Sequence, residues 1–495
     1  MRGPFRLLLA ALSAAMFCLP CGCQKPLHFP ADSLAGPAKA AGAFAAYDAN
    51  RDGVADYFTF VDPNGRINRI GYDTSADGLP DQILDLDAAG PDRCRHLLII
   101  LDGFGYDFVK RHYDAGGLRM FHPPSRVVAP YPTLTDMCME DILGYIPCRA
   151  FEAKYFDPRA NKLRGGSWDY IAGRNQPYNR LLHYRANLIW DAIGYIAPRR
   201  VFRKEVNDAV RVFNKSSSRE IRAYFVSSAG ISTQDGEIGQ ERALRLIERL
   251  VNQVLWQTRG LTKVTLLSDH GHSYTPATRI PLDDHLAARG WRLSNSLRSP
   301  RDVVCIRFGL ETYASFCTRR PDELAEDLVA CQGVELASFP EKDRVVVLAP
   351  GGARAAISQR AGRYKYQALQ GDPLRLKEVL ASLQGDSEGF YGADELLSAT
   401  GTHVYPAPLE RLWRAHFGLV ENTPDVIASL EDRYYFGSQA FAGAVKVAST
   451  HGGLNYRNSV TFIMSTAGPL PALMRSSDIP ANMQRLTGRP WPSRD

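Results

Sequence analysis

Five side chains of this sequence are suited to chemistry by their type and by the segments that carry them. Asp102, Asp269 with His270, and His451 are expected at strand ends, and Thr135 is expected at the start of a helix. Carboxylates and imidazoles are ligands of zinc-type divalent metals, and they can converge when each follows a different strand of one sheet. A threonine hydroxyl at a helix N-terminus suits attack on phosphate, because the helix end favours the anion and a metal would lower the hydroxyl pKa.

Each of these segments also has a purely structural interpretation. Asp102 followed by glycine after an aliphatic run is common turn chemistry. A single Asp-His pair after a strand, such as Asp269-His270, is often a turn with a hydrogen-bonded histidine. A metal site therefore requires the separate segments to meet in space.

The elements that would position these side chains alternate between strands and helices. Residues 97–101 are five consecutive aliphatic residues, which predicts a strand buried on both faces, as in a parallel sheet. Ligands bind at the carboxyl edge of such sheets, where Asp102 falls. Residues 286–400 are more mixed and are expected to form an inserted cap subdomain. The pattern predicts an α/β protein with a largely parallel sheet. Further strands are expected at 126–130, 221–226, 264–267 and 459–464, and helices at 136–143 and 241–257.

Four segments of the chain resemble a known superfamily, in its order: HLLIILDG; VVAPYPTLTD with ILGYIPCRAFEAKYFDP; LLSDHGH; and STHGG. They are similar to the alkaline phosphatase superfamily, and within it to the type I phosphodiesterase/nucleotide pyrophosphatase branch, over residues 95–495. The resemblance implies an alkaline-phosphatase-like fold, with a mainly parallel sheet flanked by helices and an inserted α+β cap. It also implies a divalent metal, zinc or manganese, and a phosphate-ester or nucleotide-like substrate.

The resemblance further assigns roles to individual residues. One metal would be bound by Asp102, Thr135, Asp269 and His270. Thr135 would also be the nucleophile and form a phosphothreonine intermediate, whereas Thr133 would have no covalent role.

The same match leaves a second metal position largely without ligands. The superfamily uses an aspartate, a histidine four residues later, and a late histidine that His451 matches. Ala229 and Thr233 stand where the other two ligands are expected, and Asp235 or His272 could replace them only by a different backbone path. The superfamily's phosphate-binding asparagine also has no counterpart in the helix after the nucleophile. The sequence therefore predicts one well-supplied metal position and one degenerate position.

The N-terminus has the features of an export signal. Residues 1–23 combine two early arginines with a short apolar run, which is typical of a secretory signal. The end of this segment resembles a bacterial lipoprotein signal in which Cys23 is lipidated. Residues 24–44 are rich in alanine, glycine and proline, as in a flexible tether. The protein is therefore expected in the periplasm or at the cell surface, attached to the membrane through a lipid anchor.

Residues 45–90 contain two similar acidic loops on either side of an expected β-hairpin. Each loop places oxygen-bearing side chains at positions 1, 3, 5 and 9 and glycine at position 6, a pattern that binds calcium. Both lack the acidic residue at position 12 of an EF-hand and resemble the short calcium loops of thrombospondin type 3 and dockerin-like repeats. The alternative is two aspartate-rich surface turns without metal. The expected ligands, with the position 7 residues included, are Asp48, Asn50, Asp52, Val54 and Asp56, and Asp73, Ser75, Asp77, Leu79 and Asp81.

The composition indicates whether nucleic acid is an expected partner and whether disulfides are expected. The net charge is only +6, from 59 basic and 53 acidic residues, and no long basic block is present, so nucleic acid is not an expected partner. An even set of six cysteines beyond Cys23, in an exported protein, predicts up to three disulfides. At least one bridge is expected among Cys305, Cys317 and Cys331.

These features predict an exported, metal-dependent phosphoric ester hydrolase of the phosphodiesterase type. The alternative is a catalytically weakened or inactive surface binding lipoprotein that keeps the fold, because the second metal position lacks ligands. The cap, residues 286–400, contains no motif that identifies the substrate.

Overall fold

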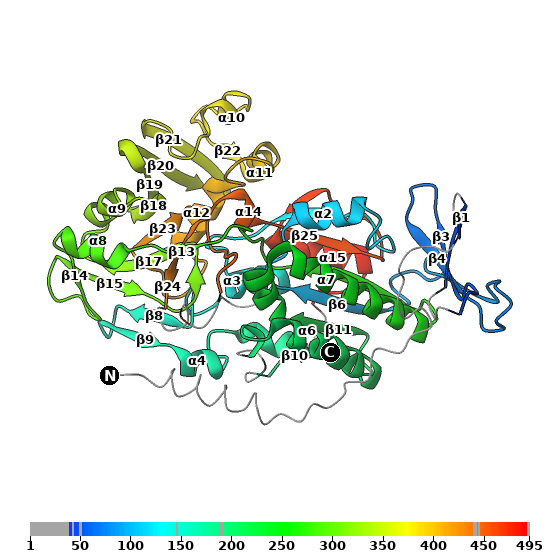
Figure 1. Cartoon of the computed structure of the whole chain (residues 1–495). Coiled ribbons are helices and arrows are strands. Elements are labelled where there is room, and N and C mark those ends of the chain that lie inside the picture. Colours follow the sequence, from blue (N-terminus) through cyan, green and yellow to red (C-terminus); the bar gives the residue numbers. More distant parts are fainter. Residues whose placement is uncertain are drawn as a thin grey trace, which may run out of the picture.

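The computed structural model describes residues 39–41, 44–48, 52–144, 147–187, 190, 193–438, 443 and 446–492. The expected signal segment with Cys23, and Asn50 of the first acidic loop, lie outside the described residues. No helix within these ranges has both the length and the apolar character needed to cross a bilayer. Figure 1 shows a central α/β domain, a cap on one side of it, and a small sheet at the opposite end.

Seven strands form the central sheet, in the order β10-β11-β6-β12-β25-β7-β26. Strands β10, β11, β6 and β12 are parallel, whereas β25 is antiparallel to its neighbours β12 and β7. Because β25 runs in reverse, the segment that enters it lies at the same edge as the carboxyl ends of β6 and β12. The bounds are β6 Arg95–Leu101, β7 Ser125–Val128, β10 Tyr184–Arg185, β11 Glu220–Phe225, β12 Thr262–Ser268, β25 Val460–Ser465 and β26 Leu473–Arg475.

Helices cover both faces of this sheet, so β6 is buried on both sides. Leu97, Ile99 and Leu101 belong to one core, which contains residues of α6 and α7. Leu98 and Ile100 belong to a second core, which contains residues of α3. The buried parallel strand predicted from the aliphatic run is confirmed, and with it the α/β class. The helices are α2 Tyr106–Asp114, α3 Thr135–Leu143, α6 Pro198–Lys215, α7 Ser227–Gln257 and α15 Ile479–Thr487.

Helix α7 begins much earlier than the sequence predicts. It was expected at 241–257, but it starts at Ser227, directly after β11, and is interrupted by Gly236 with φ 57° and ψ −144°. Its first turns are made of small polar residues, which carry no amphipathic pattern. These turns are buried because they pack closely: a Cβ at Gly230 would lie 2.2 Å from the carbonyl oxygen of Gly194. Tight backbone packing, which periodicity does not report, therefore places the start of α7 at the sheet edge.

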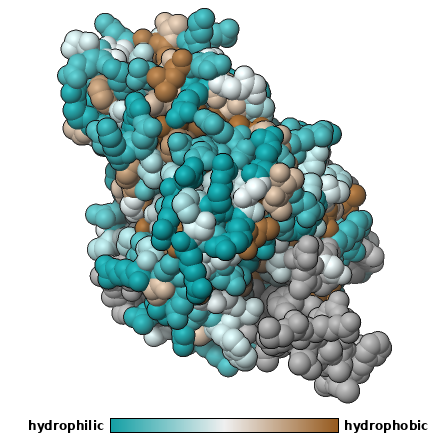
Figure 2. Space-filling model, turned by 90° about the vertical axis from the view of Figure 1, so that its left-hand side faces the viewer, coloured by the Kyte–Doolittle hydropathy of each residue, from teal (hydrophilic) through white to brown (hydrophobic). Residues whose placement is uncertain are grey.

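A nine-stranded sheet in the order β14-β15-β17-β23-β18-β19-β20-β21-β22 forms the cap. The subdomain extends beyond the expected limit of 400, because β23 inserts between β17 and β18. Figure 2 shows this side of the molecule as a mostly hydrophilic face with scattered hydrophobic residues. The strands are β14 Arg292–Leu293, β15 Asp302–Ile306, β17 Tyr313–Thr318, β18 Val334–Glu341, β19 Arg344–Ala349, β20 Ala353–Arg360, β21 Arg363–Gln370, β22 Tyr391–Gly392 and β23 Val426–Leu430. The helices are α8 Leu282–Ala288, α9 Pro321–Val329, α10 Lys377–Ala381, α11 Ala393–Thr400 and α12 Pro408–His416.

The expected disulfides are wrong. All six cysteines of the described chain are buried free thiols. In the antiparallel pair β15 and β17, Cys305 is opposite Phe316 and Val304 is opposite Cys317. A shift of one residue places the two cysteines on opposite faces of the sheet. Cys305 packs in one core with Cys331, whereas Cys317 packs in another.

Five antiparallel strands, β1 Lys39–Ala41, β2 Phe44–Tyr47, β3 Tyr57–Val61, β4 Ile67–Tyr72 and β5 Gln82–Asp85, form the N-terminal sheet. The expected hairpin is the pair β3 and β4, while β1 begins inside the segment expected to be a tether. The sheet docks on α7, since the Tyr57 hydroxyl donates to Asn252 Oδ1 at 2.9 Å.

Both acidic loops are closed by the aspartate at position 1. Asp48 accepts a hydrogen bond from the Gly53 N–H at 2.8 Å, and Asp73 accepts one from the Gly78 N–H at 2.6 Å. Calcium binding by these loops stays a prediction.

Candidate active site

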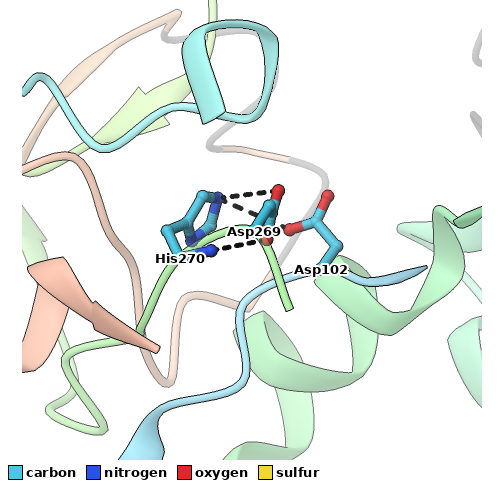
Figure 3. Close-up of side chains that lie close together, drawn as sticks. All are labelled: Asp102, Asp269 and His270. Atoms are coloured by element: carbon cyan, nitrogen blue, oxygen red, sulfur yellow. Dashed lines mark hydrogen bonds and ion pairs between the residues drawn. The ribbon is translucent and has the colours of Figure 1, made fainter. Parts of the chain in front are cut away.

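Asp102, Asp269 and His270 converge at the carboxyl edge of the central sheet. Leu101 at the end of β6 pairs with Ser268 at the end of β12. Asp102 and Asp269, the next residue of each strand, therefore lie next to each other at the edge of the sheet. His270 Nε2 lies 3.7 Å from Asp102 Oδ1 and 3.5 Å from Asp269 Oδ2, and the imidazole faces both carboxylates (Figure 3). Ligand atoms around a tetrahedral zinc-type ion are about 3.4 Å apart. The two distances from His270 are close to this value, and one ligand atom from each residue lies within 4.8 Å of the others, so the three residues could bind one ion.

Hydrogen bonds hold these ligand atoms in the state that a metal requires. His270 Nδ1 lies 2.9 Å from the Gly271 carbonyl oxygen, which accepts its proton and leaves a lone pair on Nε2. Asp269 Oδ1 accepts the backbone N–H groups of Gly103 and His270, at 3.1 and 2.8 Å. Asp269 Oδ2 and His270 Nε2 are buried without a hydrogen-bond partner among the described residues. Buried polar atoms without partners are costly unless a bound group satisfies them, so the residues present fit a divalent cation.

Burial shifts the pKa values at this site in opposite directions for acids and bases. Desolvation raises the pKa of Asp269 to about 7, although the hydrogen bonds from the backbone N–H groups of Gly103 and His270 partly offset it. Desolvation lowers the pKa of His270 to about 4. The same cause holds the pKa of His451 well below its usual range. Neutral imidazoles are the form that binds metal, and a bound cation would favour the carboxylate form of Asp269.

Thr135 is the first residue of α3 and lies at the edge of this cluster. Its hydroxyl donates to Asp102 Oδ2 at 3.3 Å, and its side chain is partly exposed. The unpaired N–H groups of the first helical turn lie beside it and favour an anion. Thr133 has a different role: its hydroxyl accepts the Gly452 N–H at 2.9 Å and donates to the Gly453 carbonyl at 3.3 Å. Thr135 thus carries the partly exposed hydroxyl beside the ligand set, whereas Thr133 joins two loops.

His451 reaches the same edge from the loop that precedes β25. Its ring stacks on His270 with 3.9 Å between centroids and 22° between planes. Its Nδ1 lies 2.8 Å from the Thr133 carbonyl oxygen, which leaves Nε2 as the atom free to bind a ligand. All five residues expected from the sequence therefore lie together.

The start of α7 borders this region, and residues 227–234 include no carboxylate or imidazole side chain. Ala229 and Thr233 are both buried there, and the Thr233 carbonyl accepts the backbone N–H groups of Ala448 and Ser449. Asp235 is held in a two-bond ion pair with Arg199, at 2.7 Å for each bond, and does not compensate.

His272 does lie beside the site. It is fully buried, its ring centroid is 5.3 Å from that of His451, and its Nε2 has no hydrogen-bond partner in the described chain.

Two residues of the site, Tyr224 and Glu311, were not predicted from the sequence. Tyr224, at the end of β11, donates its hydroxyl to Asp102 Oδ2 at 2.6 Å and fixes that carboxylate. Its position near the end of the strand expected at 221–226 was the available signal. Glu311 approaches His451, with Oε2 3.4 Å from Nε2. The sequence around Glu311 carries no motif, and only the folded chain brings it to the site.

Comparisons with known proteins give structural neighbours only. No family model matches the chain, and no curated protein matches it. A solved structure of murine ectonucleotide pyrophosphatase/phosphodiesterase 5, an inactive form in complex with AMP, is similar at a TM-score of 0.44 and 13% identity, covering 81% of this chain and 97% of its own. The human protein of the same name gives a TM-score of 0.44 at 15% identity, covering 81% and 96%. Another murine structure gives 0.43 at 12%, covering 81% and 97%.

Proposed function

We propose that this chain is a metal-dependent phosphoric ester hydrolase of the phosphodiesterase type, with an alkaline-phosphatase-like site. The observation that carries the proposal is the contact between the partly exposed Thr135 hydroxyl and a buried ligand set, Asp102, Asp269 and His270, whose ligand atoms all lie within 4.8 Å of one another. The order of the sequence motifs around these four residues supports the same conclusion.

The residues of the chain divide the reaction between them. Asp102, Asp269 and His270 would hold a zinc-type cation, which when bound would lower the pKa of the Thr135 hydroxyl and neutralise charge on the phosphate. Thr135 Oγ1 attacks phosphorus, and the bond from phosphorus to the first leaving oxygen breaks. The hydroxyl proton passes to Asp102 Oδ2, its hydrogen-bond acceptor. The helix N–H groups of α3 face the phosphoryl oxygens. The leaving oxygen departs with the bonding electrons and takes a proton from solvent. Water then attacks the phosphorus of the esterified phosphothreonine, the bond from phosphorus to Thr135 Oγ1 breaks, Asp102 returns its proton to Oγ1, and one proton of the attacking water is released to solvent.

Hydrolysis of a chromogenic diester tests the proposal. Purified protein supplied with zinc or manganese is expected to release nitrophenolate from bis(para-nitrophenyl) phosphate. Thr135→Ala is expected to abolish release and Thr135→Ser to retain part of it. Thr133→Ser, which keeps the loop hydroxyl, is the matched control and should behave as the parent. Absence of hydrolysis with either metal would overturn the proposal in favour of a binding protein that keeps the fold.

We also propose that the substrate is nucleotide-like and that the protein is exported and lipid-anchored through Cys23. Both points are supported by sequence patterns. Comparison of para-nitrophenyl thymidine monophosphate with the simple diester tests the first, with faster release from the nucleotide expected. Incorporation of labelled palmitate into the parent but not into Cys23→Ser, in a bacterial host, tests the second.

A further inference from the structure

Glu311 is fixed beside His451 by its backbone and by the space around it. It ends the short strand β16 (Leu310–Glu311), and the next N–H, from Thr312, donates to the His451 carbonyl oxygen at 2.6 Å. The Glu311 side chain folds over Gly309, where an added Cβ would lie 2.2 Å from Glu311 Oε1. The strand and the histidine loop are thus joined, and the carboxylate is held in place.

The two side chains bring a carboxylate oxygen and an imidazole nitrogen together, and the described chain records no hydrogen bond between them. His451 Nε2 and Glu311 Oε2 are 3.4 Å apart, and Glu311 Oε2 is buried without a hydrogen-bond partner in the part of the chain described. Since the Thr133 carbonyl takes the proton of His451 Nδ1, Nε2 offers a lone pair. A separation of about 3.4 Å is that of two ligands on one tetrahedral ion. This pair therefore has the spacing already seen between His270 and Asp269.

The pair adjoins the first ligand set. The stacked rings of His270 and His451 place their imidazoles side by side. Burial raises the pKa of the Glu311 carboxyl well above its usual range, and the charges of Glu152 and then of Asp102 raise it further. His272 adds a fully buried imidazole with an unpartnered Nε2 among the described residues, next to His451. Two cations about 3.5 to 4 Å apart form a common arrangement in phosphoester hydrolases.

We propose that Glu311 and His451 are ligands of a second divalent cation, bound beside the Asp102, Asp269 and His270 set. Glu311 from the cap side of the chain takes over the role that Ala229 and Thr233, on α7, cannot fill. With two protein ligands, and with side chains of His451 and Glu311 that are 14% and 15% exposed, this position stays open to substrate oxygens. The purpose of this second cation would be to stabilise the leaving oxygen, and that part of the inference rests on the proposed function.

Zinc stoichiometry of the full chain tests this ligand assignment without relying on activity. Calorimetric titration with zinc, checked by elemental analysis after dialysis, is expected to give two equivalents for the parent and one for Glu311→Gln and Glu311→Ala. The affinity of the remaining site should change less than threefold. Glu335→Gln removes another partly buried glutamate, in β18 and outside the site, and should keep two equivalents. Circular dichroism and thermal melts establish that each variant is folded.

The outcomes separate the inference from the proposed function. A parent that binds one zinc and still hydrolyses the diester would overturn the second position and leave the function intact. A folded Glu311→Gln protein that binds two zinc ions as tightly as the parent would overturn the role of Glu311. A parent that binds no zinc and shows no hydrolysis would overturn both.

Discussion

Replacing Tyr224 by phenylalanine should weaken metal binding while the fold persists. The Tyr224 hydroxyl is buried and donates to Asp102 Oδ2 at 2.6 Å, a short hydrogen bond to a charged acceptor. Such a bond contributes about 1.5 to 3 kcal/mol. Since about 1.4 kcal/mol corresponds to a tenfold change in an equilibrium constant, the loss predicts roughly 10- to 100-fold weaker zinc binding, the range found for groups that orient metal ligands.

The chain offers a closely matched control in Tyr178. Its hydroxyl donates to Asp136 Oδ1 at 2.7 Å, and both tyrosines are buried, but Asp136 is outside the ligand set. Competition with a chromophoric chelator measures zinc affinity, and thermal melts measure stability. Tyr178→Phe should lower the free energy of unfolding about as much as Tyr224→Phe does, and it should leave zinc affinity unchanged. Equal zinc affinity in Tyr224→Phe and the parent would refute the argument that this bond orients Asp102.

Three further predictions concern parts of the chain around and away from the site. Burial raises the pKa of Glu335 from 4.5 to about 7, so the carboxyl loses its proton at lower pH in the unfolded chain, and the free energy of unfolding falls as pH rises from about 4.5 to 7. Glu335→Gln should remove up to about 2 to 3 kcal/mol of this fall. Urea melts in which the variant differs from the parent by the same amount at pH 4 and at pH 8 would contradict the prediction. Gly103→Ala should lower the free energy of unfolding by about 1 to 3 kcal/mol, because Gly103 has φ 77° and a Cβ there would lie 2.7 Å from the His272 ring; an unchanged melting curve would show that the loop relaxes. Calcium should raise the melting temperature of the parent more than that of Asp73→Asn, and equal shifts would remove calcium from the second acidic loop.

The parts of the fold that the sequence predicted are those with a strong local signal. The aliphatic run before Asp102 predicted a doubly buried strand, which the structure confirms, and the candidate site lies at the carboxyl end of that strand. The helix after Thr135 was equally clear. The direction of β25 could not be predicted, because an antiparallel strand buried on both faces has the same apolar pattern as a parallel one.

The parts that were not predicted depend on contacts between distant segments. The early start of α7 depends on close packing against Gly194, which small polar residues do not signal. The cysteine spacing suggested a bridge, but a register offset of one residue separates Cys305 from Cys317. Glu311 has no motif and reaches His451 only because the β16 segment pairs with the loop before β25.

The central claim is that Thr135 is a metal-assisted nucleophile, and trapping the phosphorylated chain tests it most directly. Protein with zinc is mixed with bis(para-nitrophenyl) phosphate, quenched in acid during turnover, digested and analysed by mass spectrometry. The account predicts a para-nitrophenylphosphoryl adduct on Thr135, absent after metal removal by a chelator and absent in Thr135→Ala. Turnover at the parent rate in Thr135→Ala, or an adduct on another residue during turnover of the parent, would contradict it.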